Sequence, residues 1–321
     1  MSTNNKQLFI GLDGGGTKTL SIVIDANGNE LGQFISTCSN QNSVGKEQAK
    51  VAIMESISKA IEAAGAAPSD VVSICMGISG VDRPEDQAMV GGWVKELLPN
   101  TVYEIHNDAV VALSSGTLGK LYGVVVISGT GTIAWGINRQ GVKSRSAGWG
   151  PLLGDDGSGY QIGFDILKHV CRAKDESGPK TQLTQAVFNK LAISKEDDLI
   201  GWAYDKANSG WSKFAELSPL ATECANNGDK VAQSILDINA NALVTSIRSV
   251  FVKLGLDKLD EKVPLVLAGG NIERECLFSQ MLRTKLAEAV PNAEPIFPKC
   301  TPGKGAALLA MEQYKKTHNA Q

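Results

Sequence analysis

Gly11-Leu12-Asp13-Gly14-Gly15-Gly16-Thr17-Lys18-Thr19 is a glycine-rich segment between two apolar runs, residues 8–10 and 20–24. Two apolar runs joined by a glycine-rich turn predict a β-hairpin with a glycine tip. Because glycine has no Cβ atom, several backbone amides at such a tip can converge on one anion, and nearby hydroxyl or ammonium groups can add donors. We therefore expect phosphate contacts from five residues of the tip: Gly14, Gly15, Gly16, Thr17 and Lys18.

A second turn of the same design, Ser128-Gly129-Thr130-Gly131-Thr132, separates the apolar runs 123–127 and 133–137. Two such hairpins in one chain predict a duplicated clamp that grips a polyphosphate from both sides. Neither turn fits a Walker loop or a dinucleotide fingerprint, because those motifs open a helix whereas these turns lead into runs typical of strands. Two hairpin turns without a ligand are the alternative interpretation. The contacts expected from the second turn are Gly129, Thr130 and Gly131.

The composition limits the classes of function. A chain of 321 residues is long enough for two domains, and 43% hydrophobic with 20% charged residues is typical of a globular protein. The net charge of −3 gives no electrostatic footprint for nucleic acid or an anionic membrane. We expect no membrane span, since no stretch of the sequence approaches one. Six cysteines without a C-x-x-C pair predict reduced thiols in a cytoplasmic protein, and the sequence leaves the oligomeric state, a homodimer included, open.

Strands and helices alternate in the first half of the chain, whereas residues 158–249 carry mostly helical patterns. The run 263–268 returns to a strand and ends in glycines, and no low-complexity linker separates the two halves. We therefore expect two domains that share a hinge and a cleft. The predicted N-terminal domain is 1–116, closed by a C-terminal helix over 303–321, and the predicted C-terminal domain is 117–302.

This arrangement resembles the superfamily of actin, heat-shock ATPases and sugar kinases, which is built from duplicated ribonuclease-H-like domains. The two hairpins resemble its first and second phosphate motifs, and residues 265–271 resemble its adenosine motif. Within the superfamily the chain is similar, over nearly its whole length, to the N-acetylglucosamine kinases of the BadF/BadG/BcrA/BcrD ATPase family. The resemblance implies an α/β fold of two ribonuclease-H-like, actin-like ATPase domains with an interdomain cleft.

Residues 148–160 are the most specific part of this resemblance, because they closely match the family's sugar-binding loop. Asp156 departs from the family pattern, in which Glu is more usual at this position. Residues 38–45 resemble the N-terminal sugar-contact loop. Carboxylate and amide groups in these loops suit the hydroxyls and acetamido group of an amino sugar. The sugar contacts that the resemblance implies are Asn40, Asp108, Gly148, Trp149, Gly150 and Asp155.

Asp108 lies where a predicted strand ends and a short helix begins. A carboxylate there can accept the proton of a sugar hydroxyl that attacks a γ-phosphate, but Asp is also a common helix N-cap. The resemblance favours the catalytic role. Asp13, inside the first phosphate turn, is expected to hold Mg²⁺ through water, with a turn-forming Asp as the alternative.

Other parts of the resemblance concern the nucleotide. Gly269, Gly270 and Asn271 are expected to let a purine approach the backbone, and a loose match of residues 213–215 adds Ala215. An ordinary strand-to-helix turn is the alternative for the first three. Trp149 is equally compatible with a wall of the sugar pocket and with a core position.

The activity that the resemblance implies is ATP-dependent phosphorylation of the 6-hydroxyl of N-acetyl-D-glucosamine, with ATP and Mg²⁺ as cofactors. Sugar and ATP would be the small-molecule partners. Glucosamine, N-acetylmannosamine, N-acetylmuramic acid and glucose stay open as substrates. Two other classes also stay open: an ATPase that activates a radical dehydratase through an iron–sulfur cluster, and a sugar-sensing or cytoskeletal relative that binds nucleotide without turnover.

Overall fold

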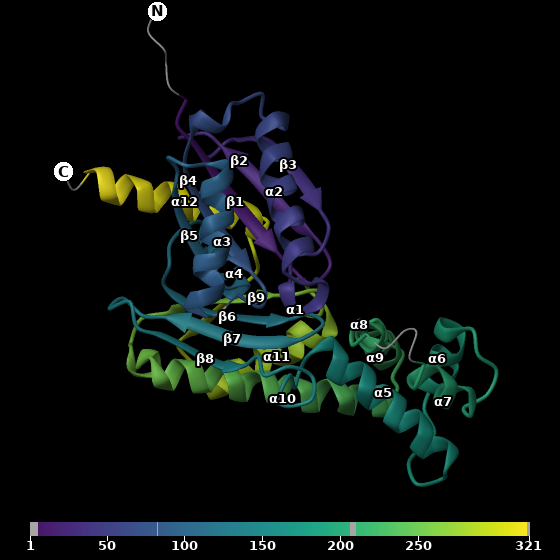
Figure 1. Cartoon of the computed structure of the whole chain (residues 1–321). Coiled ribbons are helices and arrows are strands. Elements are labelled where there is room, and N and C mark those ends of the chain that lie inside the picture. Colours follow the sequence, from purple (N-terminus) through teal and green to yellow (C-terminus); the bar gives the residue numbers. More distant parts are fainter. Residues whose placement is uncertain (1–5, 82, 206–209, 320–321) are drawn as a thin grey trace, which may run out of the picture. The chain divides into compact units, whose positions relative to one another are not determined.

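The computed structural model describes residues 6–81, 83–205 and 210–319 (Figure 1). The chain divides into two compact units: unit 1 is Met1–Tyr122 with Pro298–Gln321, and unit 2 is Gly123–Phe297. The boundaries thus fall at 122/123 and 297/298, against 116/117 and 302/303 expected from the sequence. Each unit has one five-stranded sheet with helices packed against it. The predicted α/β class is therefore confirmed.

The sheet of unit 1 has the order β3-β2-β1-β4-β5. β1 (Leu8–Gly14) pairs antiparallel with β2 (Thr19–Ile24), which pairs antiparallel with β3 (Glu30–Ser36). On its other side β1 pairs parallel with β4 (Val71–Ile78), which pairs parallel with β5 (Val102–His106). The first glycine turn is therefore the tip of a β1–β2 hairpin, as predicted.

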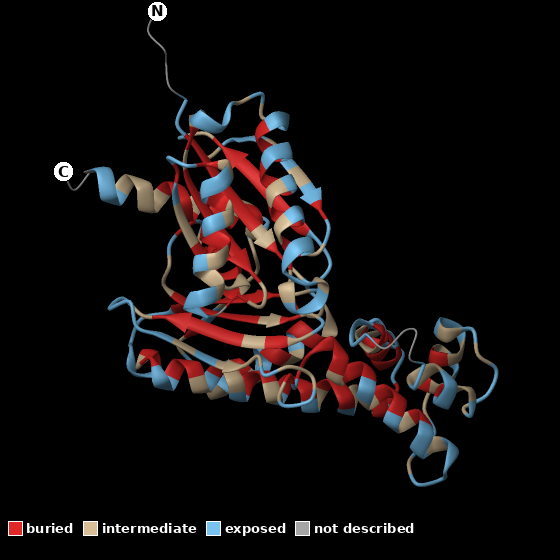
Figure 2. Ribbon diagram, viewed as in Figure 1, coloured by how far each residue is buried: buried red, intermediate tan, exposed pale blue. Residues whose placement is uncertain are grey.

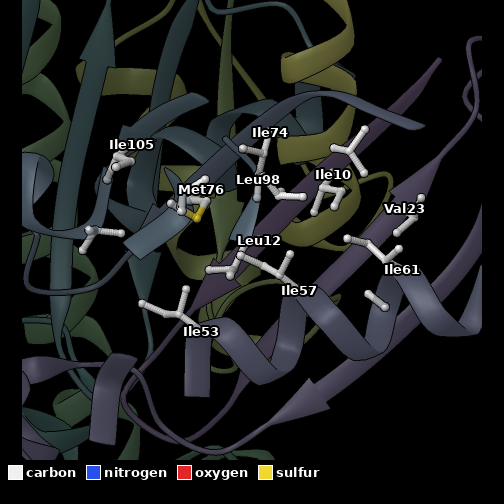
Figure 3. Close-up of a cluster of buried hydrophobic side chains, with 14 of the residues drawn as sticks. Ile10, Leu12, Val23, Ile53, Ile57, Ile61, Ile74, Met76, Leu98 and Ile105 are labelled. Atoms are coloured by element: carbon white, nitrogen blue, oxygen red, sulfur yellow. The ribbon is translucent and has the colours of Figure 1, made fainter. Parts of the chain in front are cut away.

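Alternate residues of β1 face opposite sides of this sheet. Ile10 and Leu12 join the core that Figure 3 shows, together with Ile53 and Ile57 of α2. Gly11 faces the last helix, α12, so closely that a Cβ at this position would collide with its backbone. The sheet thus packs on both faces, and the close approach of α12 requires glycine at position 11. The helices of unit 1 are α1 (Gln41–Val44), α2 (Lys46–Ala63), η1 (Pro68–Asp70), α3 (Pro84–Leu97), α4 (Asp108–Thr117) and α12 (Pro302–Asn319).

The sheet of unit 2 has the order β10-β9-β6-β7-β8. β6 (Gly123–Ser128) and β7 (Thr132–Ile137) form an antiparallel hairpin, and β7 pairs antiparallel with β8 (Lys143–Ala147). β9 (Val263–Ala268) runs parallel to β6 and to β10 (Ala293–Ile296). The second glycine turn is the tip of the β6–β7 hairpin, so both turns occupy equivalent places in their sheets.

Unit 2 also contains a helical region, and its long helix α10 corrects one expectation from the sequence. Among the described residues, α10 is the one helix long and apolar enough to cross a membrane. It packs against β7, β8, α5, α9 and α11, and Figure 2 shows its buried positions in red. These contacts are those of a core helix. The helices of unit 2 are α5 (Gly159–Lys174), α6 (Leu183–Leu191), α7 (Asp198–Ala203), α8 (Ser212–Ala215), α9 (Ser218–Asn226), α10 (Lys230–Lys253), η3 (Leu256–Lys258) and α11 (Leu277–Ala289).

Candidate functional site

The carboxyl ends of β1, β4 and β5 meet at one edge of the unit 1 sheet, because the three strands run parallel. β1 ends in Asp13 and Gly14, and the chain after β5 reaches Asp108 within two residues. The backbone N–H of Ser79, just after β4, donates to the carbonyl of Gly14 at 2.8 Å. The edge where open α/β sheets bind their ligands therefore carries both carboxylates predicted to act in the site.

Asp13 has an unusual titration. The pKa of Asp13 is raised from 3.8 to about 6: burial is the largest cause, the nearby negative charge of Asp108 adds to it, and the Lys18 ammonium opposes both effects. The two carboxylates are therefore close enough to interact, as a cation-binding pair would be. Within the described residues no group of three acidic, His or Cys side chains could enclose a metal. The carboxylate of Asp13 therefore fits a Mg²⁺ site in which one protein carboxylate binds the ion and water and phosphate oxygens supply the other ligands.

Asp108 is the first residue of α4, but it does not cap the helix. Asn107 is the N-cap, and its Oδ1 accepts a hydrogen bond from the backbone N–H of Ala109 at 2.8 Å. The capping alternative for Asp108 is therefore wrong. A carboxylate in the first turn still benefits from the positive end of the helix dipole, which stabilises its ionised form.

Residues 38–45, the predicted sugar-contact loop, lie at the same edge. A Cβ on Gly14 would collide with the hydroxyl of Ser39, so the loop packs directly on the first phosphate turn. Asn40 caps α1, since its Oδ1 accepts from the N–H of Asn42 at 3.0 Å, and its Nδ2 lies 3.5 Å from Ser79 Oγ. The structure thus brings Asn40, Ser79 and the Asp13 turn together. Ser39 and Ser79 were missed from the sequence, which offers no pattern that marks either serine.

The tip of the first turn is exposed. The N–H of Gly15 donates to the carbonyl of Lys18 at 2.9 Å and closes the turn. Gly16, Thr17 and Lys18 are all exposed, and no heavy atom lies within 4 Å of a Cβ built on Gly16. The backbone of this tip is therefore open to a ligand.

The second turn is held by two segments of unit 2. The N–H groups of Gly159 and Tyr160, at the start of α5, donate to the carbonyls of Gly129 at 2.7 Å and Thr130 at 3.2 Å. Asn271 Nδ2, beyond β9, donates to the Gly129 carbonyl at 3.1 Å and to Ser128 Oγ at 3.2 Å. Hydrogen bonds from the start of α5 and from Asn271 therefore fix the conformation of this turn.

Gly159 marks the point where the predicted nucleotide contacts meet. A Cβ on Gly159 would lie 3.0 Å from Gly129 O and 3.2 Å from both Ala215 Cβ and Asn271 Nδ2. Asn271 Oδ1 accepts from Ser218 Oγ at 2.9 Å, and the backbone N–H of Asn271 donates to the Ser128 carbonyl at 3.1 Å, so both side chain and backbone hold the loop in place. The second turn, Ala215 and Asn271 of the predicted adenosine motif therefore lie next to one another in unit 2.

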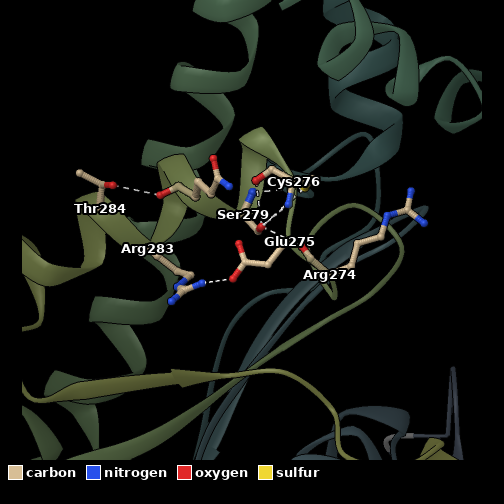
Figure 4. A network of polar contacts seen from close by, with 7 residues as sticks. Arg274, Glu275, Cys276, Ser279, Arg283 and Thr284 are labelled. Carbon is tan, nitrogen blue, oxygen red and sulfur yellow. Dashed lines mark hydrogen bonds and ion pairs between the residues drawn. The ribbon is translucent and has the colours of Figure 1, made fainter. Parts of the chain in front are cut away.

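A cavity of about 140 Å³ adjoins this point. Gly270 and Asn271 line it together with Ser218 and Thr222 of α9 and Arg274. The contributions of α9 and Arg274 were missed, because helix patterns do not reveal which loop a helix will face. Figure 4 shows how α11 begins next to it: the N–H of Cys276 donates to Ser279 Oγ, Glu275 pairs with Arg283, and Arg274 extends away from this network. The cavity is the candidate purine pocket.

Asp155 connects the predicted sugar-binding loop to the second glycine turn. Its side chain is only 8% exposed, and Oδ1 accepts from the N–H of Gly150 at 3.1 Å. The backbone amides of Thr132 and Trp149 also bond to this carboxylate, while burial raises its pKa. A Cβ on Gly131 would lie 2.6 Å from Oδ2. Through these contacts Asp155 links the conformations of the two loops.

Trp149 lies on the surface of the sugar-binding loop. Its side chain is 63% exposed, and the guanidinium of Arg145 lies 4.7 Å from its ring centroid. The core alternative for Trp149 is therefore wrong. Gly148 and Gly150 flank it with φ angles of +72° and +86°, a conformation that favours glycine.

Replacement of Asp155 by Asn should weaken binding of sugar and nucleotide together, by about 10- to 100-fold each, because the new NH₂ group faces amide donors that need an acceptor. Calorimetry of sugar binding, with and without a non-hydrolysable ATP analogue, would measure both affinities and their coupling. Asp156→Asn, an exposed neighbour, is the control. A loss confined to sugar affinity would contradict the link between the loops.

Comparisons with known proteins extend over almost the whole chain. Residues 10–310 match the BadF/BadG/BcrA/BcrD ATPase family. The N-acetyl-D-glucosamine kinase of Dictyostelium discoideum is 55% identical over 319 residues, which cover 97% of this chain and 100% of that protein. The N-acetylmuramic acid/N-acetylglucosamine kinase of Clostridium acetobutylicum is 33% identical, with coverages of 95% and 98%. A crystal structure from Chromobacterium violaceum, of a protein provisionally assigned as an N-acetylglucosamine kinase, has a TM-score of 0.75 at 24% identity and covers 95% of this chain and 99% of that chain.

Proposed function

Because the chain belongs to the BadF/BadG/BcrA/BcrD ATPase family, we propose that it is an ATP-dependent kinase for the 6-hydroxyl of N-acetyl-D-glucosamine. The products are N-acetylglucosamine 6-phosphate and ADP. The observation that carries this proposal is 55% identity, along nearly the full length, to the kinase from Dictyostelium discoideum. The paired carboxylates of Asp13 and Asp108 support it, since they supply the chemistry that phosphoryl transfer needs.

Asp108 is the base in this proposal. As the sugar O6 forms its bond to the γ-phosphorus, its proton passes to the Asp108 carboxylate, and the bond from the γ-phosphorus to the ADP oxygen breaks. Asp13 would hold Mg²⁺, which neutralises charge on the phosphates when bound. The N–H of Gly129 already donates to the Gly131 carbonyl at 3.0 Å, so Thr130, Gly131 and the first turn would donate amides to the phosphates. Asn40 and the predicted sugar-binding loop would orient the sugar.

The partners in this proposal are the sugar and ATP, and the compartment is the cytoplasm. The six cysteines are all free, which suits a reducing environment. A dehydratase activator would instead carry an iron–sulfur cluster and would be coloured. A purified protein that is brown and hydrolyses ATP without sugar would favour that second class.

N-acetylglucosamine should be used with a kcat/KM at least about 100-fold above that for glucose. A pocket built for the acetamido group leaves its buried polar partners unpaired when that group is missing. A coupled ADP-release assay over glucose, glucosamine, N-acetylmannosamine and N-acetylglucosamine would measure the preference. Equal values for glucose and N-acetylglucosamine would refute the proposed substrate.

A further inference from the structure

Lys213 is a buried cation that the proposed mechanism does not use. It belongs to the short helix α8, two residues before Ala215, and is only 6% exposed. Its Nζ donates to the carbonyl of Trp202 at 2.9 Å and to that of Ala203 at 3.2 Å, and these are the last two residues of α7. The ammonium group thus connects α8 to the end of α7.

Two aromatic rings lie against the same ammonium group. The Nζ is 4.9 Å from the ring centroid of Trp202 and 5.4 Å from that of Phe214, and the two rings pack edge to face with centroids 5.3 Å apart. Among the described residues no carboxylate pairs with Lys213. Burial of a cation is costly, so the two carbonyls and the two rings must compensate for the lost hydration. Because these groups come from both helices, the buried charge favours the one arrangement of α7 and α8 that brings them together.

α8 also packs against α5. A Cβ on Gly163 of α5 would collide with the backbone carbonyl of Phe214, so the two helices are in direct contact. The rings of Phe214 and Tyr160 have their centroids 5.4 Å apart. The backbone N–H of Tyr160 in turn donates to the carbonyl of Thr130. α8 therefore packs on the start of α5, which holds the second glycine turn.

Ala215 is the point where this arrangement reaches the predicted nucleotide contacts. A Cβ on Gly159 would lie 3.2 Å from both Ala215 Cβ and Asn271 Nδ2. A binding group is effective only when its neighbours hold it within about 0.5 Å of the productive geometry. Since the Nζ of Lys213 is bonded to carbonyls of α7, Lys213 acts through Ala215 and not by touching a ligand.

We propose that Lys213 is a positioning residue for the nucleotide base. By holding α8 to the end of α7, its ammonium group fixes Ala215 where the purine of ATP packs. The proposal rests on the proposed kinase function and on the predicted contact between Ala215 and the purine. It gives Lys213 an effect on affinity for the base and no part in the transfer of the phosphoryl group.

Lys213→Met tests this role in turnover, because methionine keeps an apolar stem and removes the charge and its donors. The KM for MgATP should rise about 10-fold, with kcat and the KM for sugar within about twofold of the wild type, since a contact made equally in ground and transition states affects binding alone. Lys213→Arg restores a charged donor and should bring the KM for MgATP back to within about threefold. Lys190→Met, at an exposed position of α6, is the matched control.

Direct binding separates the base from the phosphates. Calorimetry in the presence of Mg²⁺ compares ADP with tripolyphosphate, which has no base. In Lys213→Met the Kd for ADP should rise about 10-fold, whereas the Kd for tripolyphosphate should stay within about twofold. These measurements need no turnover. A wild type that binds ADP but phosphorylates no sugar would therefore refute the kinase function and still allow the two Kd values to decide the role of Lys213.

An unchanged Kd for ADP in Lys213→Met would overturn the proposal. Equal rises in the Kd for ADP and for tripolyphosphate would also overturn it, because they would indicate a general disturbance of unit 2. The same holds for a kcat that falls while the KM for MgATP stays unchanged. If Lys213→Met does not fold, Lys213→Gln, which keeps an uncharged donor, takes its place and is judged by the same two Kd values.

Discussion

Asp108→Asn should lower kcat by about 10²–10⁴ while Tm and sugar affinity change little. The substitution keeps the side-chain volume and removes only the ability to accept a proton, which is needed in the transition state. The structure makes this test cleaner than the sequence alone could, because Asn107 and not Asp108 caps α4. Loss of a helix cap is therefore excluded as a cause of lost activity. The measurements are kcat, Tm and sugar binding on one preparation.

Asn107→Ala is the matched control for this experiment. It removes the hydrogen bond from Asn107 Oδ1 to the Ala109 amide and should cost about 1 kcal/mol of stability. We expect a lower Tm with most of kcat retained, the reverse of the pattern for Asp108→Asn. A near-normal kcat in Asp108→Asn would remove Asp108 from the mechanism and make Asp155 the next candidate for the base.

The hairpins and the sheet edge with the candidate site could be predicted, because both depend on patterns within short stretches of sequence. Apolar runs ending in glycine place each turn at the end of a strand, and parallel pairing then brings residues such as Asp13 and Asp108 to one edge. The roles of adjacent polar residues could not be separated in the same way. Asn107 and Asp108 are both good N-caps, and only the backbone geometry decides between them.

Contacts between segments far apart in the sequence could not be predicted from sequence patterns. The Ser218 side chain bonds to that of Asn271, 53 positions further along the chain. Lys46 and Arg83 line one cavity because α2 packs against α3. The resemblance predicts Asp155 as a sugar contact, and that role stays a prediction. Its burial and its bonds to the amides of Gly150, Trp149 and Thr132 depend on how two loops fold against each other.

Asp13→Asn should abolish most use of MgATP and, at the same time, stabilise the free protein. The pKa of Asp13 is about 6 in the folded state, against 3.8 for an ordinary Asp, because burial and Asp108 disfavour its charge. The unfolded chain therefore loses this proton first, so that stability falls as pH rises from about 4 to about 6 and stays lowered above that window. Asn carries no charge and avoids the penalty.

We accordingly expect Asp13→Asn to raise the free energy of unfolding by about 1–3 kcal/mol at pH 8 and to leave it nearly unchanged at pH 4. In the wild type, use of MgATP should fall as pH drops below about 6, since a protonated carboxyl cannot hold a cation. Denaturant unfolding without ligand at both pH values, with kcat/KM for MgATP at saturating sugar, tests both expectations. Sugar affinity should be nearly intact in the variant. A variant that is less stable than the wild type at pH 8 would contradict a destabilised charge on Asp13. A variant with an unchanged dependence on MgATP would contradict its role in holding the metal.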